Sequence, residues 1–294
     1  MAASASEGSS ALAALDGAAC SACGSSGCAA RSGSSVAWTL VRRRCGEPEA
    51  EYLARVAAST RVVALATHAC AVDLWGRWRL ALELTFAPED IQPVFSGACW
   101  AGTVVWSASL CLCDHLRALD ARGLLAGRKV VELGAGLGVP AMAASLLGAA
   151  SVFATEQPPL PALLRRNVAA VFGAGGPGAG CAPPRVATLD WEADSCEQFG
   201  DGAVDLILVS DCVYAELYGE SWRALADCIR RLSTPGVTRT LNCLERRNAG
   251  DGVDDFLNYA RSIGIESRLI DKPTGPEGES LELYEMALPA APLS

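Results

Sequence analysis

A glycine loop between an apolar strand and an apolar helix is the feature that most restricts the fold of this chain. Residues 132–138 read ELGAGLG, with the short apolar run Lys129–Leu133 leading into the loop and the Ala- and Leu-rich segment Val139–Leu147 following it. A strand that turns through glycines directly into a helix is the first unit of many nucleotide-binding α/β folds. The loop therefore predicts a sheet whose carboxyl edge binds a ligand.

Strands and helices alternate over the rest of the chain. We predict strands at Lys129–Leu133, Ser151–Thr155, Val186–Leu189, Val204–Val209 and Val237–Leu244, helices at Ser107–Leu119, Val139–Leu147, Leu160–Phe172, Ser221–Leu232 and Asp254–Ile263, and a terminal hairpin of Glu266–Ile270 and Leu281–Met286. This alternation implies a parallel sheet with helices on both faces. The expected fold is α/β and Rossmann-like, with a mostly parallel seven-stranded sheet and a C-terminal antiparallel hairpin.

The first third of the chain has a different composition. Residues 1–35 are rich in Ala, Ser and Gly, which predicts a disordered low-complexity leader. Residues 36–98 are expected to form an N-terminal extension, with a helix at Glu49–Ala58 and a β-hairpin of Arg61–Leu65 and Arg77–Phe86. Residues 99–290 then form the main domain.

The glycine spacing separates two classes of cofactor. Gly134, Gly136 and Gly138 follow a Gly-x-Gly-x-Gly pattern, whereas dinucleotide-binding loops have Gly-x-Gly-x-x-Gly. A pyrophosphate needs helix N-terminal amides, but S-adenosylmethionine has no phosphate and needs close backbone approach. Glu156 follows about 20 residues later, where an acid can accept hydrogen bonds from ribose hydroxyls. That acid would serve NAD equally well, and a tight turn without a ligand is the alternative interpretation of the loop.

Polar and aromatic residues follow the next strands at the same predicted sheet edge. Trp191 comes after the third strand, and the run 210–214, SDCVY, comes after the fourth. Ligands of open α/β sheets lie outside the carboxyl ends of the strands, so Asp211 and Tyr214 are placed where a methyl acceptor would bind. An N-cap role is the alternative for Asp211. Glu245–Arg247 follow the fifth strand, and either substrate contact or a solvated loop fits them.

Composition narrows the classes of partner and compartment. The formal net charge is −9, which argues against a general nucleic-acid binder. The 13 cysteines are odd in number and mostly stand singly in apolar runs, as expected of reduced, buried thiols. Cys20, Cys23 and Cys28 lack a second ligand pair, so no metal is expected. The uncharged run Leu133–Thr155 could span a bilayer, but its glycines favour a strand, a loop and a helix.

Five segments, taken in order, resemble the seven-β-strand lysine methyltransferases known as family 16. They are residues 99–116 (CWAGTVVWSASLCLCDHL), 131–138 (VELGAGLG), 154–168 (ATEQPPLPALLRRNV), 189–192 (LDWE) and 210–214 (SDCVY). The similarity runs from about Ala98 to Leu288. Members of this family are class I methyltransferases that modify lysines of non-histone proteins such as translation factors and chaperones.

The resemblance implies a role for each site residue. The cofactor would be bound by the glycine loop with Glu132, Gly134, Ala135 and Gly136, by Trp106 above it, by Glu156 at the ribose, and by Trp191 and Ser210 beside the adenine or methionine portion. Asp211 and Tyr214 match the family's Asp-x-x-Tyr signature, so they would be catalytic, orienting the lysine amine and shaping its channel. The chain departs from the family in having Glu at position 156, where Asp is usual, and about a hundred residues before Trp100.

The sequence thus predicts an S-adenosylmethionine-dependent protein-lysine N-methyltransferase. Its expected partner is a lysine-bearing protein, such as a translation factor or chaperone, with no stable nucleic acid and no membrane. A monomer in the cytoplasm is expected, with a nuclear or plastid location left open. The alternatives are a methyltransferase for a small molecule or RNA, a non-catalytic cofactor-binding scaffold and, disfavoured by the glycine spacing, an NAD-dependent oxidoreductase.

Overall fold

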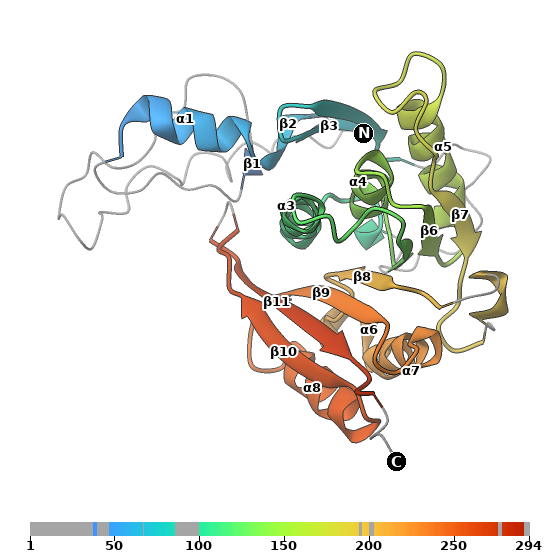
Figure 1. Cartoon of the computed structure of the whole chain (residues 1–294). Coiled ribbons are helices and arrows are strands. Elements are labelled where there is room, and N and C mark those ends of the chain that lie inside the picture. Colours follow the sequence, from blue (N-terminus) through green and yellow to red (C-terminus); the bar gives the residue numbers. More distant parts are fainter. Residues whose placement is uncertain are drawn as a thin grey trace, which may run out of the picture.

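A seven-stranded sheet forms the centre of the molecule (Figure 1). The computed structural model describes residues 38–39, 47–66, 68–85, 100–193, 196–199, 203–275 and 278–290. The sheet contains β5 (Lys129–Leu133), β6 (Ser151–Glu156), β7 (Arg185–Thr188), β8 (Leu206–Ser210), β9 (Arg239–Arg246), β10 (Glu266–Asp271) and β11 (Ser280–Ala287). Their order is β10-β11-β9-β8-β5-β6-β7, and all neighbours are parallel except β11, which is antiparallel to both β9 and β10. The predicted fold class is confirmed.

The strand order places a ligand crevice beside β5. From β5 the chain builds outward through β6 and β7, then returns to β8 on the other side of β5 and continues to β9. Val131 of β5 pairs with Phe153 of β6 and with Ile207 of β8, so the carboxyl ends of these three strands meet at one edge. The reversal of strand order at this edge leaves the crevice in which ligands of such sheets bind.

Helices cover both faces of the sheet (Figure 1). The helices on one face are α3 (Ser107–Asp120), α4 (Val139–Leu146) and α5 (Leu160–Phe172), and those on the other are α7 (Trp222–Leu232) and α8 (Val253–Ser262), with the short α6 (Ala215–Tyr218) leading into α7. The uncharged run Leu133–Thr155 folds as a strand end, a loop, α4 and most of β6. None of the helices in the described ranges is long and apolar enough to cross a membrane.

A second, antiparallel sheet lies on the α3 and α5 side of the domain. It consists of β1 (Trp38–Thr39), β2 (Thr60–Leu65), β3 (Ala69–Leu74) and β4 (Trp78–Glu83) in chain order, and α1 (Glu49–Ala57) precedes β2. The sequence predicted only a hairpin here, because β3 was not recognised. Val72, Leu80 and Leu82 of this sheet are buried in one cluster with Leu112 of α3 and Leu163 of α5. The described part of the extension therefore shares a core with the main domain.

Two polar side chains of the helices attach this sheet to the main domain. Asp114 of α3 accepts hydrogen bonds from the backbone N–H of Thr60 and from Trp75 Nε1, both at 2.8 Å. Asn167 of α5 accepts the backbone N–H of Glu83 at 2.8 Å and donates to the carbonyl of the same residue at 3.1 Å. Residues 1–35, for which the sequence predicted a disordered leader, lie outside the described residues.

Candidate active site

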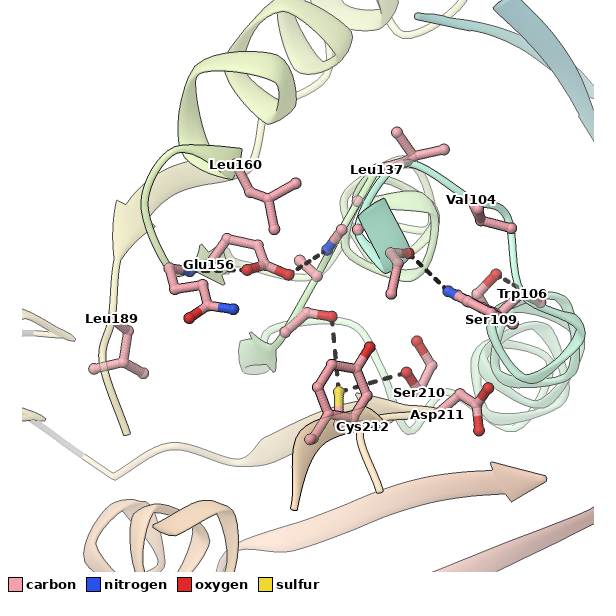
Figure 2. A pocket seen from close by; sticks show the side chains of 18 of the residues that line it. Val104, Trp106, Ser109, Leu137, Glu156, Leu160, Leu189, Ser210, Asp211 and Cys212 are labelled. Atoms are coloured by element: carbon pink, nitrogen blue, oxygen red, sulfur yellow. Dashed lines mark hydrogen bonds between the residues drawn. The ribbon is translucent and has the colours of Figure 1, made fainter. Parts of the chain in front are cut away.

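A cavity of about 430 Å³ lies at the carboxyl ends of β5, β6 and β8 (Figure 2). The glycine loop, the start of α3, the end of β6, the segments after β7 and β8, and the start of α7 surround it. Eight of the ten predicted site residues line it, namely Trp106, Gly134, Ala135, Gly136, Glu156, Trp191, Ser210 and Asp211. Its volume is in the range of sites that enclose a cofactor-sized ligand. The structure thus brings together residues that are far apart in the sequence.

The glycines of the loop are required by its backbone conformation. Gly134 has φ +63° and Gly136 has φ +53°, in the left-handed region that side chains disfavour. A Cβ atom on Gly134 would lie 2.6 Å from Cys212 Sγ, and one on Gly136 would lie 3.2 Å from the carbonyl oxygen of Gly102. The loop therefore passes so close to two other segments that only glycine fits, which leaves its backbone exposed to the cavity.

Glu156 joins the end of β6 to this loop. One carboxylate oxygen accepts the backbone N–H of Gly136 at 3.0 Å, and the other accepts that of Gln157 at 2.8 Å. Burial raises the pKa of Glu156 to about 7, although both hydrogen bonds act to lower it. Figure 2 shows Glu156 on one side of the cavity and Trp106 and Asp211 on the other. The carboxylate is thus a buried acceptor that titrates near neutral pH.

Glu132 differs from the prediction because it lies behind the loop and does not line the cavity. Its side chain is completely buried, and one carboxylate oxygen accepts the N–H of Ala141 in the first turn of α4 at 2.8 Å. The other oxygen has no hydrogen-bond partner among the described residues. Burial raises the pKa of Glu132 well above its usual value, and the charge of Glu156 adds to this effect. Glu132 therefore holds the start of α4 through the N–H of Ala141 and does not face the ligand.

Asp211 follows β8 in a strained conformation. Its φ is +54°, and its N–H donates to the carbonyl of Cys243 at 2.8 Å, which extends the contact between β8 and β9. The side chain does not cap the next helix, since α6 begins after Tyr214 without a side-chain cap. Instead the carboxylate forms a two-point ion pair with Arg247, with Nη1–Oδ1 at 3.0 Å and Nη2–Oδ2 at 2.5 Å. The backbone of Asp211 thus directs its carboxylate toward the end of β9.

The Tyr214 ring lies beside Arg247, outside the cavity. It does not line the cavity, and its hydroxyl donates to Glu216 at 2.6 Å, which raises the pKa of Tyr214. The Arg247 guanidinium lies 4.6 Å from the centre of the Tyr214 ring and 5.6 Å from that of Trp106. The predicted catalytic pair is therefore joined by an arginine between its two members.

Sequence reasoning missed several residues of the site. Gly102, Cys212 and Tyr218 line the cavity, and none of them stands at a defining position of a motif. The Cys212 thiol faces the carbonyl of Leu133 at 3.5 Å, and burial raises its pKa well above the usual value, so it is a packing group rather than a nucleophile. Arg247 was visible in the Glu-Arg-Arg run, but the direction of its side chain could not be inferred.

Neither metal nor disulfide chemistry is evident in the described ranges. No group of three or more His, Cys, Asp or Glu side chains there could hold a metal ion, and the eight described cysteines are free thiols. Cys20, Cys23 and Cys28 lie outside the described residues.

The cavity fits S-adenosylmethionine, the cofactor expected from the sequence. The exposed backbone of the glycine loop suits the amino-acid portion, and the Glu156 carboxylate can accept hydrogen bonds from ribose hydroxyls. Leu160, Leu189 and Trp191 give the same cavity an apolar wall for a planar base. The donors, acceptors and apolar surface that this cofactor needs are thus all present.

Comparison with known proteins places the chain in a family. The family model described as lysine methyltransferase matches residues 96–262, more than half of the 294 residues. The chain is 35% identical over 159 residues to Secreted RxLR effector protein 48 of Plasmopara viticola, covering 51% of this chain and 80% of that protein. It is 34% identical over 140 residues to Protein N-lysine methyltransferase METTL21A of Danio rerio, covering 48% of this chain and 59% of that one.

A third relative, EEF1A lysine methyltransferase 3 of Mus musculus, is 33% identical over 155 residues, covering 52% of this chain and 59% of that protein. The matched region thus spans less than two thirds of both methyltransferases and most of the effector protein. The matched region of this chain contains the glycine loop, Glu156 and Asp211, which form the cavity described above. The chain belongs to the lysine methyltransferase family, and S-adenosylmethionine is its cofactor.

Proposed function

We propose that this chain is a protein-lysine N-methyltransferase. The observation that carries the proposal is the division of the cavity into two ends. Glu156 lies on one side, which suits the ribose of the cofactor, and Asp211 and Trp106 lie on the other (Figure 2). A carboxylate beside an aromatic ring is the chemistry that binds an amine-bearing side chain.

The reaction requires a neutral amine in line with the methyl group. S-adenosylmethionine supplies a methyl carbon on a positively charged sulfur. The amine nitrogen forms a bond to this carbon as the carbon–sulfur bond breaks, and the extra proton on nitrogen passes to water. A free lysine has a pKa near 10.4, so its neutral form costs about 4–5 kcal/mol at pH 7. Holding the two reactants in line supplies up to roughly 7–11 kcal/mol in the best intramolecular cases.

Asp211 and Tyr214 have distinct roles in this proposal. Asp211 orients the lysine amine by accepting its hydrogen bond, and Tyr214 shapes the outer part of the lysine channel. Asp211 need not take the proton, because water can accept it. The hydrogen bond between Tyr214 and Glu216 fixes the tyrosine ring, which supports a shaping role rather than an acid–base role.

The substrate proposed is a lysine on a non-histone protein. Two of the relatives carry names that specify protein lysine or EEF1A lysine as the target, so a translation elongation factor is the first substrate to test. This chain has a formal net charge of −9, which favours a substrate protein whose surface around the target lysine is basic. We also propose that the protein acts as a monomer and that it lies in the cytoplasm, a compartment that keeps thiols such as the eight described free cysteines reduced.

The proposal is tested by transfer of label into a cell lysate. Purified protein is incubated with tritiated S-adenosylmethionine and lysate, and the products are treated with protease or with nuclease. The expected result is label that protease releases and nuclease does not. Nuclease-sensitive or small-molecule label would support the alternative substrates, and calorimetric cofactor binding without any transfer would support a scaffold.

A further inference from the structure

The guanidinium of Arg247 is enclosed by two aromatic rings and two carboxylates. It lies over the rings of Trp106 and Tyr214, at 5.6 and 4.6 Å from their centres. Its Nη2 atom is 2.5 Å from Asp211 Oδ2 and 2.8 Å from Glu245 Oε2. The Arg247 side chain is only 17% exposed. Aromatic rings and carboxylates are also the groups that bind an alkylammonium ion, such as the side chain of lysine.

This cation lies directly beside the cofactor cavity. Trp106 and Asp211 line the cavity and contact Arg247 at the same time, whereas Arg247 itself does not line it. A lysine amine that approaches the cavity from this side would pass these two residues. On this side of the cavity, Arg247 lies against both residues.

We propose that Arg247 occupies the acceptor subsite as an internal substitute for the substrate lysine, and that the incoming lysine displaces it. Asp211, Glu245, Trp106 and Tyr214 are then the residues that select a cationic acceptor. This inference rests on the proposed function, because it assumes that the acceptor is an amine.

The charges at the site favour an exchange of one cation for another. Asp211 is only 7% exposed, so removal of Arg247 without replacement would leave a buried carboxylate unpaired. A lysine ammonium that enters as Arg247 leaves keeps the carboxylate paired. Burial acts to lower the pKa of Arg247, but the hydrogen bond and charge of Asp211 outweigh it and raise that pKa, so the arginine does not lose its proton and become a substrate. The internal cation thus blocks the site without being consumed.

The surroundings of Arg247 allow its side chain to move without a change in the sheet. The preceding residue, Arg246, is directed elsewhere and pairs with Glu282 at 2.8 Å and with Asp254 at 2.6 Å, which fixes the end of β9. The residues after Arg247 form an exposed loop in which Asn248 donates to Glu216 at 2.9 Å. Displacement of Arg247 therefore requires a change in one side chain and its loop, not in the sheet.

The Arg247→Lys substitution tests this proposal, because a lysine at position 247 can itself be methylated. The chain has only two lysines, Lys129 and Lys272, so a new lysine is easily followed by mass spectrometry. If residue 247 occupies the acceptor subsite, its amine nitrogen will form a bond to the methyl carbon as the carbon–sulfur bond breaks. S-adenosylhomocysteine then leaves, and the proton passes to water. We expect methylation of the lysine introduced at position 247, at a rate that does not depend on protein concentration.

Arg223→Lys is the matched control. Arg223 also lies over two rings, Trp222 at 4.4 Å and Tyr259 at 5.2 Å, and it pairs with Glu220 at 2.9 Å. Unlike Trp106 and Asp211 beside Arg247, none of these partners lines the cavity. A lysine introduced at position 223 would also lie beside two aromatic rings and a carboxylate, but it would not reach the cofactor. We expect it to remain unmodified.

The outcomes separate this inference from the proposed function. Methylation at position 247 in Arg247→Lys, without methylation at position 223 in Arg223→Lys, supports the inference. If position 247 stays unmodified in an Arg247→Lys protein that still labels lysate proteins, the inference is overturned and the proposed function is left intact. If neither the wild type nor the variant labels lysate proteins, the proposed function fails and the inference fails with it.

Arg247→Ala gives a second measurement should the lysine variant not fold. The probe is N-acetyl-lysine methylamide, a small acceptor that cannot use distant protein contacts to displace Arg247. Removal of the internal cation should raise its methylation rate several-fold over that of the wild type. A merely structural role for Arg247 predicts the opposite, and an equal or lower rate would overturn the inference.

Discussion

The carboxylate of Glu156 accepts the backbone N–H of Gly136 at 3.0 Å, so the end of β6 holds the glycine loop in place. The same carboxylate is the acceptor expected to bind the ribose hydroxyls of the cofactor. Burial brings the pKa of this group to about 7, which makes both contacts sensitive to pH near neutrality.

Cofactor affinity should weaken as the pH falls through 7. The hydroxyls of the cofactor need an ionised acceptor, and the proton that binds with a pKa of about 7 competes with them. Linkage predicts an affinity about tenfold lower at pH 6 than at pH 8. Calorimetric titration at both values measures this, and Glu156→Gln should show weak binding without the pH dependence. A wild type that binds equally at both values would contradict the role of Glu156.

The cofactor-free protein should show the opposite trend in stability. The pKa of Glu156 rises from 4.5 to about 7 on folding, so between these values the folded state binds more protons than the unfolded chain. The free energy of unfolding of the cofactor-free protein therefore falls as the pH rises from about 4.5 to 7. Thermal unfolding of the wild type compared with Glu156→Gln isolates this effect. A difference between the two proteins that does not change with pH would refute the assignment.

Gly134→Ala should remove cofactor binding. The new Cβ would lie 2.6 Å from Cys212 Sγ, and φ +63° adds backbone strain of about 1–2 kcal/mol. Gly148→Ala is the matched control, because Gly148 has φ +89° but nothing within 4 Å of a Cβ atom. We expect both variants to lose stability in thermal unfolding, and only Gly134→Ala to lose affinity in calorimetry. Normal binding by Gly134→Ala would show that the loop does not need to approach Cys212 so closely.

Asp211→Asn should slow methyl transfer and leave cofactor affinity unchanged. The substitution keeps the shape of the side chain and removes the charge that orients the amine, which is worth about 1.5–3 kcal/mol, or roughly a tenfold or greater loss of rate. Arg247 retains Glu245 as a partner at 2.8 Å, so the fold is expected to survive. Initial rates with tritiated cofactor and lysate test this, alongside calorimetry. A full rate with unchanged affinity would eliminate Asp211 as a catalytic residue.

Asn167→Ala should loosen the N-terminal sheet without affecting the cofactor. Asn167 is 1% exposed and makes two hydrogen bonds to the backbone of Glu83, so its loss costs about 1–3 kcal/mol. Hydrogen exchange should become faster in β3 and β4. Arg166→Ala is the control, because its pair with Glu83 is more exposed and contributes about 1 kcal/mol or less. Equal effects of the two variants would contradict the anchoring role of Asn167.

The parts of the fold that could be predicted are those with strong local patterns. The apolar run at Lys129–Leu133 and its glycine loop located the centre of the sheet and the edge where the cavity lies. Strand β3 was missed because the connection from β2, at residues 66–68, contains no Gly, Pro, Asn or Asp to signal a turn.

The detailed contacts of the site could not be predicted, because they depend on backbone geometry. The left-handed conformation of Asp211, with φ +54°, turns its carboxylate to Arg247, and no sequence pattern reveals such a conformation in aspartate. Glu132 was expected in the cavity because it precedes the loop, yet its place in β5 directs the side chain to Ala141.

The central claim is that the cavity methylates lysine, and the identity of the labelled amino acid tests it most directly. Lysate proteins labelled by the enzyme and tritiated S-adenosylmethionine are hydrolysed completely, and the amino acids are separated by chromatography. The account predicts label that elutes with mono-, di- or trimethyllysine and decreases strongly with Asp211→Asn. Label that elutes with methylarginine or methylhistidine, or that is unchanged in this variant, would contradict it.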